Sequence, residues 1–178
     1  AEFYQRKAQW PAPTPAFAPS DITGLQLWLD ASDDQTLYDA TTGGSLVAAD
    51  GGVARWEDKS GNDYHMTQAT AGSRPARKTA IQAGLDVLRF DGSDDVLVAS
   101  GTSSTITNLT GGQATLLAVF STASANPDAL QTIVSNGFSS AGDIGFNLFH
   151  ADRVSASESD DIRVRVVNSG SGNNVLYD

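Results

Sequence analysis

The order of apolar and polar residues along the chain predicts a protein built from β-strands. Apolar and polar positions alternate in residues 24–30 (GLQLWLD), 143–149 (DIGFNLF) and 161–167 (DIRVRVV). Residues 114–120 (ATLLAVF) and 131–135 (QTIVS) are more continuously apolar, as expected for strands that are covered on both faces. Alternation with a period of two places every second side chain on the same face of a strand. These five segments are therefore the first candidate strands.

The same alternation predicts which side chains face the core. In the later strands we expect Ile144, Phe146 and Leu148 to lie on one face. We expect Ile162, Val164 and Val166 to point inward. Two further strands, 85–90 (LDVLRF) and 95–100 (DVLVAS), flank an acidic turn. Glycine-rich turn signals such as TTGG, DGG and SGND separate the segments, and no segment carries a sustained helical apolar stripe. The pattern predicts an all-β sandwich.

Residues 1–20 differ from the rest of the chain. Four of the six prolines lie there, and their spacing favours an extended segment. The same segment carries four aromatic residues: Phe3, Tyr4, Trp10 and Phe17. Large rings on an extended arm favour a surface that buries them. We predict that this arm docks on a neighbouring subunit, and packing against its own domain, residues 21–178, is the alternative.

Composition narrows the class of protein. The length of 178 residues suits one domain with an extension, and there is no cysteine for a disulfide or a thiolate metal site. The formal net charge of -10 argues against a nucleic-acid binder and against an anionic membrane surface, since both need basic residues. No apolar run is long enough to span a membrane. We expect neither nucleic acid nor membrane as a partner.

Residues 53–68 (VARWEDKSGNDYHMTQ) are the densest cluster of chemically useful side chains. Glycoside hydrolysis needs two carboxylates about 5–10 Å apart across a cleft, whereas Glu57 and Asp58 are adjacent and would point to opposite faces of a strand. The structural interpretation places Trp56 in the core and lets Asp58, Ser60 and the Gly61–Asn62 pair form a turn. We favour the structural interpretation, and we expect no catalytic residue and no enzymatic activity.

Acidic turns are the candidate metal ligands. Asp91, Asp94 and Asp95 surround a glycine in FDGSDD, and calcium prefers such oxygen clusters, but the EF-hand loop pattern is absent. A second acidic turn, at 30–34 (DASDD), also lacks the EF-hand loop pattern. Each is more often a solvated turn than a calcium site, so we expect no cofactor, with calcium as the open alternative. The basic residues at 74–78 (RPARK) would suit an anion, but we favour a solvated loop.

Three motifs together resemble a known superfamily. They are DITGLQLWLDASD (21–33), VARWEDKSGNDYHMTQ (53–68) and LRFDGSDDVLVAS (88–100). Their order and spacing are similar to those of the concanavalin A-like lectin/glucanase superfamily, in its laminin-G-like branch found in bacterial surface and phage structural proteins. The resemblance implies a jelly-roll sandwich of two antiparallel sheets and a binding or adhesive module. The short glutamate-rich strand motif of the glycosidase members is missing.

The resemblance and the arm together lead to a functional expectation. We expect a non-enzymatic virion protein, tail-associated or capsid-decorating, located on the virion surface or outside the cell. Its partners would be other subunits of a homo-oligomeric assembly, and the outward-facing domain would contact a cell-surface glycan. The expected ligand loops contain Asp58, Asn62, Tyr64, Asp91, Asp94 and Asp95. The alternative is a secreted bacterial carbohydrate-binding or adhesion module. The chain stops just after a strand (NNVLYD), so we expect a partner, or further chain, to cover that edge.

Overall fold

The fold comes from a computed structural model of the chain. The structure describes residues 17–100, 115–122, 130–136, 145–151, 161–167 and 174–177. In these ranges the chain forms antiparallel β-sheets, and helical structure is limited to three short 3-10 turns. The turns are η1 (Pro19–Asp21), η2 (Asp34–Thr36) and η3 (Ala71–Ser73). The prediction of a predominantly β protein is therefore confirmed. None of the helical turns in the described ranges has the length or apolar character to cross a membrane.

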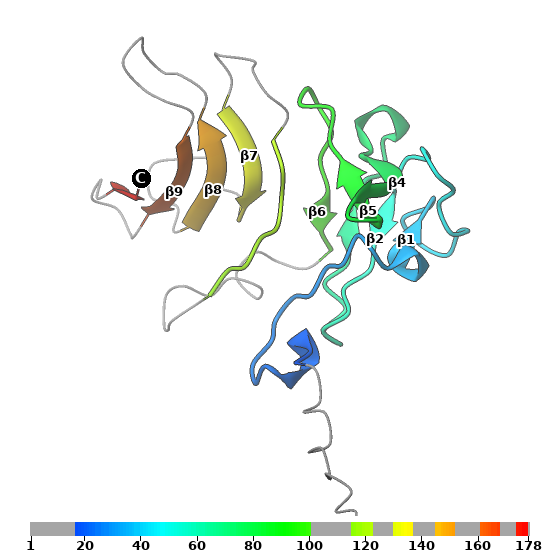
Figure 1. Cartoon of the computed structure of the whole chain (residues 1–178), viewed down its shortest axis with the longest axis horizontal. Coiled ribbons are helices and arrows are strands. Elements are labelled where there is room, and N and C mark those ends of the chain that lie inside the picture. Colours follow the sequence, from blue (N-terminus) through cyan, green and yellow to red (C-terminus); the bar gives the residue numbers. More distant parts are fainter. Residues whose placement is uncertain are drawn as a thin grey trace, which may run out of the picture.

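The first half of the chain forms one sheet of very short strands and one hairpin. The sheet has the order β1-β2-β3-β6 and consists of β1 (Leu37–Tyr38), β2 (Arg55–Trp56), β3 (Met66–Thr67) and β6 (Val98–Ala99). The hairpin pairs β4 (Ala76–Gln82) with β5 (Leu85–Arg89). Backbone hydrogen bonds from Val53 to Pro75 and from Arg77 to Gly51 connect the hairpin to the segment before β2. The four-stranded sheet and the β4–β5 hairpin therefore lie next to each other (Figure 1).

The buried core of this half is small and lies between the short sheet and the hairpin. Leu37, Val47 and Val53 are at most 3% exposed, and Trp56 and Leu88 pack against them. Leu37 and Trp56 are directly opposite each other on β1 and β2, so their side chains share a face. The prediction that Trp56 faces the core is confirmed.

The second half of the chain forms a separate four-stranded sheet. Its strands are β7 (Leu130–Ser135), β8 (Gly145–Ala151), β9 (Asp161–Val167) and β10 (Asn174–Tyr177), in the order β10-β9-β8-β7. In Figure 1, β7, β8 and β9 stand apart from the elements of the first half. Leu148 and His150 are 9% exposed and share one face of β8 with the half-buried Phe146. The prediction that Phe146 and Leu148 lie on one face of this strand is therefore confirmed, and Ile144 lies outside the described residues.

Three strand-level predictions were wrong or only partly right. Residues 24–30 form no strand pair in the described part of the chain, because side chains of the 58–62 loop take up several of their backbone groups. Residues 115–120 are mostly exposed and form no strand. Residues 131–135 form a strand, but they are not covered on both faces, since Thr132 and Ser135 are exposed. Ile162 is 42% exposed rather than inward, while Val164 is half-buried. The side chain of Val166 is not among the parts of the chain that the structure describes.

Burial of Leu37 generates a stability prediction. Leu37→Ala removes a fully buried side chain from the three-residue core, and we expect a loss of about 2–5 kcal/mol in the free energy of unfolding. Leu85→Ala is the matched control, because Leu85 is 56% exposed, and its effect should stay within about 0.5 kcal/mol. Urea denaturation followed by tryptophan fluorescence measures both. Equal losses in the two variants would contradict this assignment of the core.

Candidate functional site

The carboxylate of Asp58 organises the stretch that carries most of the candidate chemistry. Asp58 is 7% exposed. Its Oδ1 accepts hydrogen bonds from the backbone N–H of Trp28 at 2.9 Å and of Ser60 at 2.8 Å. Its Oδ2 accepts one from the Ser60 hydroxyl at 2.7 Å and one from the backbone N–H of Tyr64 at 3.2 Å. A carboxylate with four donors is fully occupied, and it fastens the 58–65 loop to residues 25–30.

Asn62 fastens the same two segments from the other side of the loop. Its side-chain amide donates to the carbonyl oxygens of Leu25 and Gln26, both at 3.0 Å. Gly61 has a positive φ of 89°, which suits the predicted turn, and the second left-handed residue of the loop is Asp63, with a φ of 59°. Asp and Asn both tolerate this conformation better than most residues. The predicted structural role of Asp58 and Ser60 in this turn is therefore confirmed, and Asp58 and Asn62, which were also candidate ligand residues, hold the loop in place.

A lysine between two aspartates completes the contact with residues 25–33. The Lys59 ammonium lies 3.2 Å from Asp30 Oδ2 and 2.7 Å from Asp33 Oδ2. The same ammonium lies 4.5 Å from the centre of the Trp28 ring, within the range of a cation–π contact. The acidic turn at 30–34 therefore uses two of its three carboxylates to bind Lys59. Sequence analysis missed this role, because a lysine 26 or more residues away gives no local signal.

The neighbouring acid Glu57 has a different partner. Glu57 Oε1 lies 3.1 Å from Arg55 Nη2, and the Arg55 guanidinium lies 4.2 Å from the centre of the Tyr38 ring. Asp58 thus binds the loop while Glu57 binds a strand residue, and the two acids do not converge on one point. His65 Nδ1 accepts the backbone N–H of Asp58 at 3.1 Å, so this imidazole is also part of the fold. The geometry gives the loop no acid–base pair.

Hydrogen bonding keeps the Asp58 carboxylate ionised. Burial alone would raise the pKa of Asp58, but the donors from Trp28, Ser60 and Tyr64 outweigh burial and lower the pKa below its usual value. A lowered pKa in the folded state means that the ionised form stabilises the fold above the pKa of the unfolded chain. This contribution is lost as the pH falls from about 4 through the folded-state pKa.

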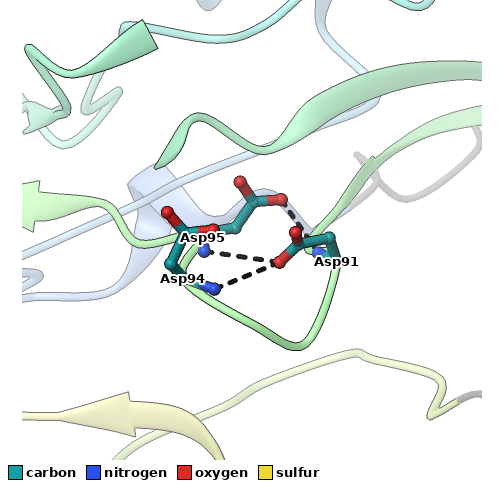
Figure 2. Close-up of side chains that lie close together, drawn as sticks. All are labelled: Asp91, Asp94 and Asp95. Carbon is teal, nitrogen blue, oxygen red and sulfur yellow. Dashed lines mark hydrogen bonds between the residues drawn. The ribbon is translucent and has the colours of Figure 1, made fainter. Parts of the chain in front are cut away.

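The second candidate loop, residues 91–95, is a compact acidic turn (Figure 2). Asp91 Oδ1 accepts the backbone N–H of Ser93 at 2.8 Å, of Asp94 at 3.3 Å and of Asp95 at 3.4 Å. Asp95 Oδ2 accepts the backbone N–H of Asp91 at 2.8 Å, and Asp94 Oδ2 accepts the Ser73 hydroxyl at 2.8 Å. The turn is therefore closed by its own carboxylates and attached to η3.

The three carboxylates of this turn also have the donor set that a calcium ion takes. One oxygen from each of Asp91, Asp94 and Asp95 lies within 4.8 Å of the others. Hydrogen bonds from the backbone, chiefly that of Ser93, lower the pKa of Asp91, so this group is ionised at neutral pH. Calcium binds six to eight oxygens, whereas each carboxylate here already accepts a hydrogen bond within the protein. The turn thus has a structural explanation without an ion.

The basic residues at 74–78 are structural in the same sense. Arg77 donates to Asp86 at 2.7 Å, to Asp34 at 3.1 Å and to the Val47 carbonyl at 2.6 Å. Lys78 Nζ lies 2.6 Å from Asp50 Oδ1. Both residues belong to strand β4, so the prediction of a solvated loop was wrong. Their cationic groups neutralise nearby carboxylates instead of offering a cradle for an anion.

Of the remaining residues that were predicted to dock the arm or to line a ligand loop, the structure describes two, Phe17 and Tyr64. Phe17 is 73% exposed, and Tyr64 is half-buried with its backbone N–H on Asp58. Phe3, Tyr4 and Trp10 lie outside the described residues. Among the described residues, no hydrogen bond joins the 58–65 loop to the 91–95 turn.

No protein-family model, no curated protein and no solved structure matches this chain. The likeness to laminin-G-like domains therefore rests on the sequence motifs alone.

The Asp58 network predicts a specific effect of a neutral replacement. Asp58→Asn keeps the size of the side chain but turns one accepting oxygen into a donor, so buried N–H groups lose their acceptor. We expect a loss of about 2–3 kcal/mol in the free energy of unfolding. Asp63→Asn is the matched control, because Asp63 is exposed and its new amide suits a positive φ. This control should change stability by less than about 0.5 kcal/mol.

The acid dependence of unfolding provides a second readout for the same pair of variants. Stability of the parent chain should decrease as the pH is lowered below about 4, where Asp58 takes up a proton. Asp58→Asn lacks this group and should show a shallower decrease, while Asp63→Asn should follow the parent. Parallel acid profiles for all three proteins would contradict the role assigned to Asp58.

The acidic turn predicts the response to calcium. Because the hydrogen bonds of Asp91 already close the turn, millimolar calcium should leave the thermal midpoint within about 1 °C of that measured in EDTA. Magnesium at the same concentration controls for ionic strength. A saturable increase with calcium that disappears in Asp94→Ala would contradict the prediction and would assign a metal site to this turn.

Proposed function

We propose that this chain is a non-enzymatic structural and binding component of a virion, either tail-associated or decorating the capsid. Its β-sheets form a jelly-roll domain that faces outward, and its N-terminal arm docks on a neighbouring subunit. The arm supplies attachment through Phe3, Tyr4, Trp10 and Phe17. Contacts with a cell-surface glycan come from the surface around the 58–65 loop and the 91–95 turn.

The observation that carries this proposal is the closed hydrogen-bond network around Asp58. Residues 53–68 carry most of the candidate chemistry. Within them, the following side chains make contacts that hold the fold together: Glu57, Asp58, Lys59 and His65. A catalytic carboxylate needs a free oxygen that faces the substrate, whereas both oxygens of Asp58 are occupied by protein donors. This arrangement favours a rigid binding scaffold over a hydrolase.

Exposure at the start of the domain supports an attachment role for the arm. Phe17 is a large aromatic residue with 73% of its surface exposed, next to the η1 turn that begins the described chain. An aromatic residue gains free energy when another surface covers it. Residues 1–20 carry a net charge of +1 against -11 for residues 21–178, so the arm is electrostatically matched to the acidic domain of a neighbour.

The alternative is a secreted bacterial carbohydrate-binding or adhesion module. Such a module needs exposed aromatic rings on which a sugar can stack. The Trp28 ring is already in contact with the Lys59 ammonium, which leaves Tyr64 and the 46% exposed Phe90 as candidate platforms. The two functions differ in assembly, since a free-standing module requires no neighbouring copy.

Light scattering on the full chain and on a variant lacking residues 1–17 tests the proposal. This truncation leaves the η1 turn intact, with its hydrogen bond from the Asp21 N–H to the Ala18 carbonyl. We expect an oligomer of defined mass for the full chain and a smaller species for the truncated chain. As a control, Phe17→Ala in the full chain should weaken the oligomer without changing the circular dichroism spectrum. A monomer in all three cases would favour the carbohydrate-binding alternative, and glycan-array binding would then test it.

A further inference from the structure

A hydrogen bond between a histidine ring and the backbone closes the base of the 58–65 loop. The Asp58 N–H donates to His65 Nδ1 at 3.1 Å, so this bond joins the first residue of the loop to the last. The His65 side chain is half-buried. Its backbone carbonyl accepts the N–H of Ser100, which follows β6, at 2.8 Å. The ring therefore lies where the loop meets the paired strands β3 and β6.

This bond requires a neutral imidazole. A neutral ring has one N–H and one nitrogen that accepts, whereas both nitrogens of an imidazolium are donors. Because Nδ1 is the acceptor here, the proton of the neutral ring lies on Nε2. A second proton would add an N–H at Nδ1, directed at the N–H of Asp58. Two donors cannot bond to each other, so protonation removes the bond that closes the loop and leaves both N–H groups without that partner.

We propose that His65 is an acid-sensitive switch: protonation of its ring breaks the bond to Asp58 and opens the 58–65 loop, while the core of the first half stays folded. The open loop binds one more proton at Nδ1 than the closed loop. By linkage, the closed population is therefore largest at high pH and decreases as the pH falls. The inference goes beyond the proposed function and does not rest on it, because it concerns the loop itself.

The charged and titratable groups around the ring fit a switch that depends on the histidine. They come from β2, from the loop and from the 30–34 turn: Arg55, Glu57, Asp58, Lys59, Asp63, Tyr64, Asp30, Asp33 and Asp34. Residues 96–100, on the β6 side, carry no charge. Of all these residue types and histidine, only histidine ordinarily changes charge between about pH 5 and 8. Opening therefore belongs to that pH range.

Asp58 is the anion closest along the hydrogen-bond network to the added proton. Its pKa is lowered by donors from Trp28, Ser60 and Tyr64, so the carboxylate stays ionised throughout this pH range. Both of its oxygens already accept from protein donors. The carboxylate therefore offers no free acceptor to replace the bond that protonation of the ring removes.

Opening of the loop reaches the segment beside it. Asp58 Oδ1 accepts the N–H of Trp28, and the Lys59 ammonium lies 4.5 Å from the centre of the Trp28 ring. Residues 24–30 form no strand pair in the described part of the chain, so these contacts attach them to the loop. The Trp28 amide is therefore a reporter of the switch that lies outside the loop.

Amide hydrogen exchange of the full chain, followed by NMR, tests the switch. Each rate is converted to a protection factor, which removes the intrinsic effect of pH on exchange. The reporters are the three amides that donate to the Asp58 carboxylate: Trp28, Ser60 and Tyr64. Their protection in the parent should fall by about tenfold between about pH 7.5 and pH 5.5, as expected for the loss of one hydrogen bond. The Val47 amide, which donates to the Leu37 carbonyl in the core, should keep its protection within about twofold.

Two substitutions of His65 separate the acceptor from the charge. Asn Oδ1 is as many bonds from the backbone as His Nδ1, and it accepts at any pH. His65→Asn should therefore keep the high protection of the parent at both pH values. His65→Ala has no acceptor and should show the low protection at both. Circular dichroism checks that each variant folds, and the parent and His65→Asn decide the question if His65→Ala does not fold.

The outcomes that would overturn the inference are specific. Equal protection of the parent at the two pH values would show that the loop does not respond to the ring. A tenfold loss in His65→Asn as well would assign the response to another group. A parallel loss at Val47 would show global unfolding instead of a local opening. None of these results changes the mass measured by light scattering, so the proposed function is tested separately.

Discussion

The buried carboxylate of Asp58 is the constraint on which the organisation of the first half depends. It takes backbone donors from Trp28, Ser60 and Tyr64, and so holds together two segments that are about 30 residues apart. Strands β1, β2 and β3 are only two residues long, too short to fix the chain by ladder hydrogen bonds alone. A buried, fully bonded carboxylate supplies the order that longer strands would otherwise give.

This constraint also determines which parts of the surface are free for function. Charged groups that resemble a site in the sequence are engaged in pairs, such as Lys59 with Asp33 and Arg77 with Asp86. Polar chemistry in the described residues is therefore mostly internal, while large apolar side chains remain exposed. Leu117 and Val119 are the clearest examples.

The two halves differ in how they gain stability. The first half relies on ion pairs and side-chain hydrogen bonds around a core of Leu37, Val47 and Val53. In the second half, the described backbone shows continuous antiparallel pairing, in which seven residues of β8 are matched with seven of β9. Acid should destabilise the first half, because protonation of Asp58 removes an acceptor that several backbone N–H groups share.

The sequence by itself determined the β class, the strands at 85–89 and 131–135, the face that Phe146 and Leu148 share, and the structural role of Trp56. These features follow from local alternation and turn residues, which act within a few positions of the chain. Tertiary structure alone decided that residues 24–30 bind loop side chains instead of a strand, and that Lys59 joins Asp30 and Asp33. It also decided the exposure of residues 115–120. The physical reason is that hydrogen-bond partners and covering surfaces come from distant residues, and local periodicity carries no information about which distant group arrives.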